Sequence, residues 1–481
     1  MDSSDFLCQE NLRKTLLPRK QPNIKQGICM RKSVALLLVL VFLTASSIAT
    51  SLPVKAEPKT IVVPDDYPTI QEAIDNASAG DRVFVKKGIY DVRVVIDKSV
   101  SLIGEERETT IIRPASYSRY WSWDYGIQVT VDNVTISGFT IDGAVYDVTI
   151  EVRDFPIGWK SITESSIKNV KYGIILGDSK GVRIFGNNII NNERAGVSVS
   201  GENNQVYQNN ITDNDAGVVT NTNTIARIFK PSCHVISENI IARNNVGISV
   251  SSSNTTVLGN EVVNNYREGI SVGNCFNVTV SGNIISNNGG SNQTNENRGG
   301  LSLSYWGSYY VYGNNITYNQ GNGISFGEYC SNSVVWNNNI TNNDIGIIEY
   351  NVRDIGEGNK LFQNNIIDNQ QQVAINQTLD VAKGTGTDIV ALDNGKIGNY
   401  WSDYLTRYSN ATEVDSSGIG NMPYVIDDNN IDHYPLMQPV NILVTTLEPE
   451  PFPVVPVAAV SVSVVAAIGV GLLFYFKKRK H

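Results

Sequence analysis

The chain has 481 residues, of which 41% are hydrophobic and 18% charged, with 38 basic and 47 acidic side chains. The hydrophobic content and the lack of any long charged block exclude a disordered chain and a coiled coil. Gly occurs 40 times, and Asn recurs beside Ile or Val between residues 186 and 369, a bias that is typical of a repeat.

Residues 1–56 are expected to be a leader and secretory signal. The pair Arg31-Lys32 precedes an apolar run, and the segment closes with the small-x-small pattern Val54-Lys55-Ala56. Met30 is the predicted true start, with cleavage after Ala56. An N-terminal membrane anchor is the alternative, although the apolar run is short for a span.

Residues 57–143 are predicted to form an N-terminal cap and the first coils of a repeat fold. Thr69-Ile70-Gln71-Glu72 is a capping box, and the apolar residues that follow share one face of a short helix. Such a helix would plug the open end of a solenoid. Strands are expected at Arg82–Lys86, Val92–Asp97 and Val100–Gly104.

Residues 144–370 carry the repeat. The segment Gly186-Asn-Asn-Ile189-Ile-Asn-Asn192 recurs about every 22 residues, with insertions. The central isoleucine is matched in the clear copies by Ile211, Ile285, Ile316, Ile340 and Ile366, and in the weaker copies by Ile141, Ile167, Ile240 and Val262.

Each unit also holds a Gly-apolar-x-apolar strand, such as Gly196–Val199, and a further alternating strand, such as Gly181–Ile184. Three short strands per unit predict an all-β fold, a right-handed three-sheet parallel β-helix. Coils stack about 4.8 Å apart, so Ile and Val should fill inward rows. Asn at the bends should bond to backbone groups and to the Asn one coil away.

The C-terminal part is divided by composition. Residues 371–446 are expected to be a C-terminal cap and residues 447–453 a Pro-rich stalk. Residues 454–476 have no charge and suffice for a transmembrane helix, and the basic tail 477–481 places its end in the cytoplasm. The predicted location is therefore the cell membrane, with a single pass and the main domain outside.

The charge of the predicted ectodomain limits its partners. Removing the 12 basic and 3 acidic residues outside positions 57–453 leaves 26 basic and 44 acidic side chains, a net charge of −18. Nucleic acid and anionic lipid are unfavourable partners for such a field, whereas cations and neutral polymers are favourable ones.

Two motifs carry a family resemblance. Val62-Val63-Pro64 through Ile74 resembles the opening of pectin-lyase-like β-helix proteins, and Gly398-Asn399-Tyr400-Trp401 with Pro423-Tyr424-Val425-Ile426-Asp427 resembles the end of NosD-type repeats of archaeal surface proteins. The resemblance implies a pectin-lyase-like fold and raises a copper-handling role. Copper needs clustered soft or imidazole ligands. His234, His433 and the methionines show no such spacing, so no metal site and no cofactor are predicted.

Three cysteines remain in the ectodomain, at Cys233, Cys275 and Cys330. They fall two coils apart from one another, about 10 Å, whereas bridged Cα atoms lie within about 7 Å. Three unpaired thiols are therefore predicted.

An enzyme on this fold would leave a cluster of titratable groups. A lyase needs a base beside a carboxylate, and a hydrolase needs two carboxylates about 5–10 Å apart. The densest cluster of titratable residues is acidic with one arginine and comprises Asp142, Asp147, Glu151, Arg153 and Asp154. These residues are either catalytic or ordinary solvated charges in turns.

Glycan binding has a signal of its own. Aromatic residues at similar offsets from Gly300, Gly323 and Gly346 would form a strip on which an extended sugar chain could stack, or would shield a corner of the helix. These corner aromatics are Tyr305, Trp306, Tyr329 and Tyr350.

Ten Asn-x-Ser/Thr sequons also predict a glycoprotein, with exposed sites such as Asn292 and Asn410 favoured over sites in the Asn row. The sequence thus favours a membrane-anchored extracellular β-helix, structural or carbohydrate-binding, with a glycan or cell-envelope polymer as partner. A polysaccharide lyase or glycoside hydrolase is the first alternative, and a copper-handling accessory protein is the second.

Overall fold

The computed structural model describes residues 57–114, 125–143, 171–221, 231–290, 299–305, 307–327, 330–350, 358–376 and 391–442. The predicted leader, stalk and membrane segment lie outside these ranges. None of the helices in the described ranges has the length and apolar character needed to span a bilayer.

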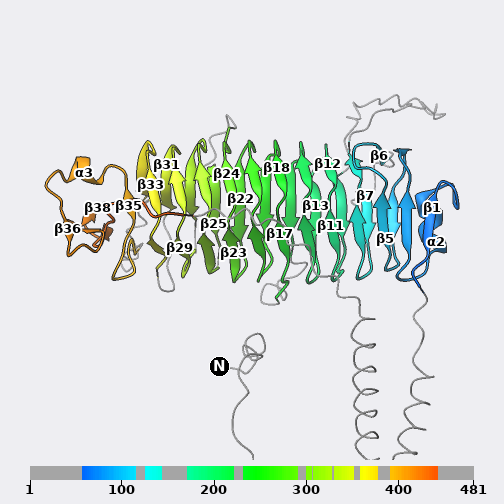
Figure 1. Cartoon of the computed structure of the whole chain (residues 1–481), viewed down its shortest axis with the longest axis horizontal. Helices are drawn as coiled ribbons and strands as arrows, with labels where there is room; N and C mark the ends of the chain where they lie inside the picture. The colour runs from blue at the N-terminus through cyan, green and yellow to red at the C-terminus, as the bar shows by residue number, and fades with distance from the viewer. Residues whose placement is uncertain are drawn as a thin grey trace, which may run out of the picture. The chain divides into compact units, whose positions relative to one another are not determined.

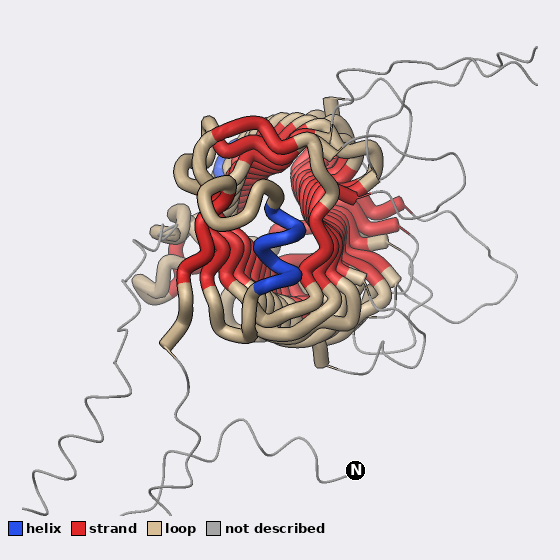
Figure 2. The backbone as a smooth tube through the Cα atoms, turned by 90° about the vertical axis from the view of Figure 1, so that its right-hand side faces the viewer, coloured by secondary structure: helices blue, strands red, loops and turns tan. Residues whose placement is uncertain are grey.

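Three parallel sheets, here named A, B and C, wind into a solenoid in which each coil contributes one strand to each sheet (Figures 1 and 2). Sheet A contains β1 (Thr60–Val63), β2 (Arg82–Val85), β5 (Ser101–Gly104), β8 (Thr135–Ser137), β11 (Arg183–Phe185), β14 (Gln205–Tyr207), β17 (Val235–Ser237), β20 (Thr256–Leu258), β23 (Val278–Ser281), β26 (Tyr309–Tyr312), β29 (Val334–Trp336) and β32 (Lys360–Phe362).

Sheet B contains β3 (Gly88–Tyr90), β6 (Thr110–Ile112), β9 (Thr140–Asp142), β12 (Asn188–Ile190), β15 (Asn210–Thr212), β18 (Ile240–Ala242), β21 (Glu261–Val263), β24 (Ile284–Ser286), β27 (Asn315–Thr317), β30 (Asn339–Thr341), β33 (Asn365–Ile367) and β35 (Tyr400–Trp401). Sheet C contains β4 (Val94–Ile96), β7 (Tyr125–Val129), β10 (Tyr172–Leu176), β13 (Ala195–Val199), β16 (Ala216–Thr220), β19 (Val246–Val250), β22 (Glu268–Gly273), β25 (Gly299–Ser304), β28 (Asn322–Phe326), β31 (Ile345–Tyr350) and β34 (Gln371–Asn376).

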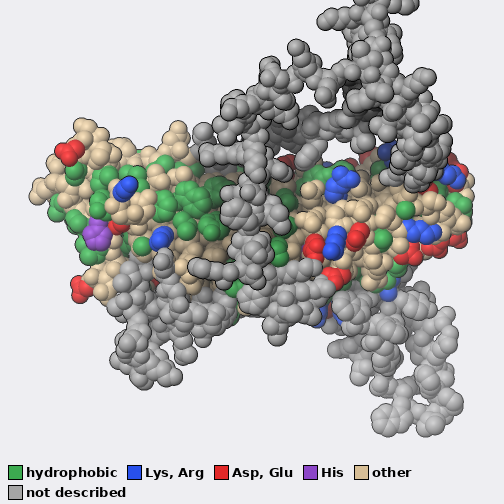
Figure 3. Space-filling model, turned by 90° about the horizontal axis from the view of Figure 1, so that it is seen from below, with side chains coloured by type: hydrophobic (Ala, Val, Ile, Leu, Met, Phe, Trp, Pro, Cys, Tyr) green, Lys and Arg blue, Asp and Glu red, His purple; other side chains and the backbone are tan. Residues whose placement is uncertain are grey.

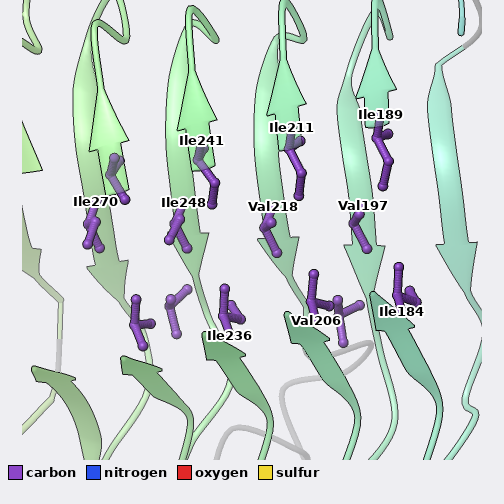
Figure 4. Packing of buried hydrophobic residues seen from close by; sticks show 14 of the residues in the cluster. Ile184, Ile189, Val197, Val206, Ile211, Val218, Ile236, Ile241, Ile248 and Ile270 are labelled. Carbon is purple, nitrogen blue, oxygen red and sulfur yellow. The ribbon is translucent and has the colours of Figure 1, made fainter. Parts of the chain in front are cut away.

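The core is a set of inward columns, because alternate residues of each strand point to opposite faces. In one coil Ile184, Ile189 and Val197 point inward from sheets A, B and C, and equivalent residues continue in the next coils (Figure 4). These three side chains are fully buried. The predicted three-sheet parallel β-helix is thereby confirmed within the described ranges.

One predicted core position is wrong by one residue. Ile211 lies opposite Ile241, not Ile240, and Ile240 is 47% exposed. The register is set by the corner, where Asn209 donates to Asn239. That bond places the second isoleucine after Asn239 in the core column. Ile167, another predicted position, lies outside the described residues.

Two ladders of buried asparagine line the corners on either side of sheet B. The amide nitrogen of each member donates to the side-chain oxygen of the next at 2.7–3.1 Å. The first ladder contains Asn187, Asn209, Asn239, Asn260, Asn283, Asn314, Asn338, Asn364 and Asn399, and the second contains Asn192, Asn214, Asn244, Asn265, Asn288, Asn319, Asn343 and Asn369. The same nitrogens also donate to backbone carbonyls, so the predicted double role of asparagine is confirmed.

A glycine at the second position of the sheet C strands from β7 to β31 is required for a steric reason. A Cβ on Gly247 would lie 2.3 Å from the carbonyl oxygen of Gly269 and 2.6 Å from Cγ1 of Val262. Real Cβ atoms do not approach backbone oxygen so closely, and overpacking of this kind is destabilising. Glycine at this position therefore lets neighbouring coils approach each other.

The N-terminal end is closed by helix α2 (Ile70–Asn76), as predicted. The Thr69 hydroxyl accepts a hydrogen bond from the Glu72 amide at 3.1 Å, and Ile70, Ala73 and Ile74 are fully buried. In the end-on view of Figure 2 the helix lies across the opening of the coil.

The C-terminal end is closed by a compact cap with α3 (Tyr404–Arg407), β36 (Glu413–Val414), β37 (Ile419–Gly420), β38 (Tyr424–Val425) and β39 (Ile431–Asp432). Trp401 stacks on Tyr424 with ring centroids 4.3 Å apart. Buried Asp432 accepts from the Asn399 amide at 2.7 Å and from the Trp401 ring nitrogen at 2.8 Å. Burial raises the pKa of Asp432 to about 6.

Cys233, Cys275 and Cys330 are free, as predicted. Cys275 and Cys330 are fully buried, whereas Cys233 is exposed. Burial raises the pKa of the Cys275 thiol to about 12, which keeps it protonated and unreactive at neutral pH.

Candidate functional site

An open groove of about 600 Å³ lies on the outer face of sheet C, across strands β10, β13, β16, β19 and β22. Its lining includes residues of the strands themselves and of the corners that precede them. The lining residues are Tyr172, Arg194, Ala195, Asp215, Ala216, Val219, Asn221, Asn245, Val246, Ser249, Arg267, Glu268 and Ser271.

The floor of the groove is one outward column of sheet C. Ser198 lies opposite Val219, which lies opposite Ser249, and the column continues to Ser271. Asn221 donates its amide nitrogen to the Ser198 hydroxyl at 3.1 Å. Within the lining, Ser249 and Ser271 offer hydroxyl groups on adjacent coils about 4.8 Å apart, whereas Val219 contributes an apolar side chain to the same column.

The rim is built from the residues that precede the strand glycines. Arg194 lies 3.4 Å from the Tyr172 hydroxyl, and Asn245 donates to Asp215 at 3.1 Å. These contacts join neighbouring coils along the edge of the groove. They hold an arginine, a carboxylate and an amide at fixed positions above the floor.

Glu268 and Arg267 form the far end of the rim. Arg267 donates to Glu268 at 3.3 Å, and the Glu268 side chain is 8% exposed. Burial raises the pKa of Glu268, while Arg267 opposes that shift. Within the described part of the chain, Nε of Arg267 is buried and makes no hydrogen bond.

Asp215 and Glu268 are the two carboxylates of the groove, and the distance between them bears on whether they could act together in glycoside hydrolysis. Asp215 precedes β16 and Glu268 begins β22, two coil steps further on. Their backbones therefore lie about 10 Å apart. Inverting glycosidases place their two carboxyl groups about 6.5–9.5 Å apart, and the backbone spacing of this pair is close to the upper end of that range.

The sequence did not single out this groove. Its residues are spread over about 100 positions and become neighbours only through the coil register. One signal was available, because the position just before the strand glycine is repeatedly polar or small, as in Tyr172, Ala195 and Glu268.

The corner aromatics are only partly within the described residues, because Trp306 and Tyr329 lie outside them. Tyr305 is 46% exposed and Tyr350 is half-buried. Tyr350 is in register with Ser304 through Gly327, so it sits one residue earlier in its coil than Tyr305. Its hydroxyl accepts from Asn322 at 3.1 Å. Both tyrosines belong to one corner, two coils apart, and neither lines the groove.

Of the predicted acidic cluster, only Asp142 lies within the described residues; Asp147, Glu151, Arg153 and Asp154 do not. Asp142 ends β9 on sheet B, is buried, and accepts from the side chain of Asn191 at 2.9 Å. It is not a lining residue of the groove.

No three residues of the types His, Cys, Asp and Glu come together as metal ligands in the ranges that the structure describes. His234 is buried and accepts from the Asn204 amide at 3.3 Å, and burial lowers its pKa to about 4. His433 pairs with Asp393 in the C-terminal cap. Each imidazole is thus used within the fold.

Several sequons can now be placed. Asn210, Asn315 and Asn339 each follow a ladder asparagine and lie half-buried on the outer face of sheet B, outside the ladder in which the sequence analysis placed some of them. Asn410 is exposed, and Asn292 lies outside the described residues. The predicted modification stays a prediction.

Comparisons with protein families agree with the fold. Residues 116–230 and 157–291 match the model described as right handed beta helix region, and residues 236–406 match the model described as periplasmic copper-binding protein (NosD). The chain is therefore a right-handed parallel β-helix with a NosD domain. A comparison with curated proteins finds no match.

Several solved structures are similar to this chain at low identity. The A-module of the mannuronan C-5 epimerase of Azotobacter vinelandii is 18% identical, with a TM-score of 0.44 over 65% of this chain and 94% of that one. The Dettilon tailspike protein is 14% identical, with a TM-score of 0.46 over 71% and 66%. Pectate lyase Pel9A is 13% identical, with a TM-score of 0.41 over 78% and 83%. These likenesses concern the fold alone.

Proposed function

We propose that the protein is a membrane-anchored, outward-facing β-helix that binds an extended glycan of the cell surface or the environment in the groove of sheet C. The groove itself carries the proposal. It offers Ser249 and Ser271 on its floor, Asn245 and Tyr172 on its rim, and donors and acceptors in similar number.

The chemistry of the groove suits a polyhydroxylated chain. Sugar hydroxyls bind planar amides, carboxylates and guanidinium groups in pairs, and a sugar ring can pack against the Tyr172 ring. Arg194 and Asp215 also balance each other in charge, which favours a neutral or weakly charged ligand. The predicted signal and membrane segment support the extracellular location.

The proposal is tested with glycan arrays probed by the full chain in detergent. Replacing Ser249 by Phe should block the floor without touching the core, because the side chain points outward. Ser237→Phe, on the outer face of sheet A in the same coil, is the matched control. Binding that is lost only in Ser249→Phe supports the groove, and equal binding by both variants contradicts it.

Hydrolysis of the bound glycan is a second candidate, because Asp215 and Glu268 line the same groove about 10 Å apart. Glu268, whose pKa is raised by burial, would donate a proton to the leaving oxygen, and Asp215 would activate water. In this case Glu268→Gln should still bind glycan but release no reducing ends. Asp213→Asn, in the same turn as Asp215 but not among the lining residues of the groove, should leave release unchanged.

A further inference from the structure

The outer face of sheet A differs in charge from the rest of the protein. None of its strands in the described residues contains Asp or Glu, although acidic side chains outnumber basic ones in the whole chain. Its charged residues are basic and exposed, namely Arg82, Arg183 and Lys360. The strands of this face therefore carry no negative charge of their own, although Glu105 and Glu238 follow β5 and β17 at its edge.

An aromatic strip occupies the C-terminal end of the same face. It consists of Tyr310, Tyr312, Trp336 and Phe362, from the consecutive strands β26, β29 and β32. Tyr310 and Tyr312 are 39% and 38% exposed. Seen from below, hydrophobic side chains gather toward the C-terminal end of the solenoid (Figure 3). Exposed aromatic clusters of this kind mark an interaction surface.

The geometry of the aromatic rings limits which kinds of partner the strip can bind. Tyr312 stacks on Trp336 with centroids 4.6 Å apart, and Trp336 stacks on Phe362 with centroids 6.5 Å apart. The rings stack along the axis of the solenoid, one ring per coil. Their faces therefore contact each other, and their edges point outward. A sugar ring packs on an aromatic face, which this stack does not offer. Tyr and Trp edges instead suit the interface between lipid headgroups and hydrocarbon.

The path of the chain limits the distance between this strip and the predicted membrane segment. Val440 exchanges two hydrogen bonds with the Asn365 side chain, at 2.7 and 2.8 Å. Asn365 follows Phe362 by three residues, so the backbone at Val440 lies within about 15 Å of the strip. From there to Val454 the chain can extend about 50 Å at most, at about 3.6 Å per residue. The predicted membrane segment therefore begins within about 65 Å of the strip.

We infer that the outer face of sheet A is a lipid-contacting surface, on which the aromatic strip enters the headgroup region of the bilayer that holds the chain's own C-terminal segment. The solenoid then lies side-on to the membrane, and sheets B and C stay in water. This inference rests on the membrane anchor of the proposed function. It adds a second contact that is separate from the anchor.

The test uses the full chain reconstituted in vesicles of equal amounts of phosphatidylcholine and phosphatidylglycerol. A background with Cys8, Cys29 and Cys233 replaced by Ser leaves the buried Cys275 and Cys330 in place. A nitroxide is attached through Tyr312→Cys or, as a control in the same coil, through Thr317→Cys on the outer face of sheet B. Collision rates with oxygen and with a water-soluble nickel complex are measured.

We expect the label at position 312 to show a severalfold higher ratio of oxygen to nickel collisions than the label at 317. Equal ratios at the two positions would overturn the inference, and so would a loss of both collision rates at 312, which would indicate a protein partner. Extraction of the vesicles with alkaline carbonate distinguishes failure of the membrane anchor from failure of the lipid-contact inference alone. A chain that carbonate removes from the vesicles overturns both the anchor and the inference, whereas a retained chain with position 312 in water overturns the inference alone.

A second measurement needs no new cysteine. Brominated phosphatidylcholine in the vesicles should quench part of the tryptophan fluorescence, and Trp336→Phe should remove that part. Trp401→Phe, in the buried cap, should leave the quenched part unchanged. Quenching that persists in Trp336→Phe would also count against the inference.

Discussion

Replacing Asn314 by alanine tests whether the asparagine ladder stabilises the coils. The Asn314 side chain takes part in five hydrogen bonds. Its oxygen accepts from the backbone and side-chain nitrogens of Asn283, at 3.0 and 2.9 Å. Its nitrogen donates to Val280, Tyr312 and Asn338, at 2.9, 3.1 and 2.9 Å.

The expected loss of stability follows from the groups that would remain without a partner. The Asn283 side-chain nitrogen keeps two backbone acceptors, and the Asn338 oxygen keeps the Asn314 amide. The Asn283 amide and the bond to the Val280 carbonyl have no such replacement. Each unsatisfied buried group costs about 1–3 kcal/mol. Asn314→Ala should therefore lower the free energy of unfolding by about 2–6 kcal/mol.

The neighbouring residue is the matched control. Asn315 lies half-buried on the outer face of sheet B, so Asn315→Ala should change stability by less than about 0.5 kcal/mol. Urea unfolding of residues 57–442 by far-UV circular dichroism compares the two variants, and hydrogen exchange reports the Asn283 amide. A difference below about 1 kcal/mol between the variants, or an Asn283 amide that stays equally protected, would refute the role of the ladder.

Three further predictions concern the core, the cap and the thiols. Ile285→Ala should cost about 2–5 kcal/mol in urea unfolding, whereas Ile284→Ala, on the outer face, should cost much less; equal costs would contradict the register. Because burial raises the pKa of Asp432 to about 6, its contribution is present below pH 3.8 and is lost as pH rises through 6. Thermal unfolding between these values should show a loss of about 3 kcal/mol, absent in Asp432→Asn. A maleimide should label Cys233 in the native protein and Cys275 and Cys330 only after unfolding, and native labelling of all three would argue against the packing.

Much of the fold could be predicted because the repeat records it directly. The spacing of Asn and Ile gives the coil, and coil counting gives the free state of Cys275 and Cys330. The error at Ile240 shows the limit of this reasoning. The copy at Asn239 has one asparagine before the isoleucines instead of two, so hydropathy alone does not show whether Ile240 or Ile241 points into the core. The hydrogen bond between Asn209 and Asn239 sets the register that buries Ile241.

The groove and the aromatic strip could not be predicted in the same way. Both lie on outward faces, where side chains vary from coil to coil and carry no periodic signal. Tyr350 lies four residues after Gly346, as Gly327 lies four residues after Gly323, so counting from the glycines already separates it from Tyr305, which lies five residues after Gly300. Tyr312, Trp336 and Phe362 form a column only when three strands are aligned residue by residue.

The first asparagine ladder has a direction, since the backbone amide of each member donates to the side-chain oxygen of the member one coil further toward the C-terminus. Asp432 ends that series, because its carboxylate accepts from the backbone amide of Asn399. Whole units could therefore be duplicated upstream of it and the rod would grow longer while its terminus stayed the same. The position of one acidic side chain marks where growth by duplication must stop.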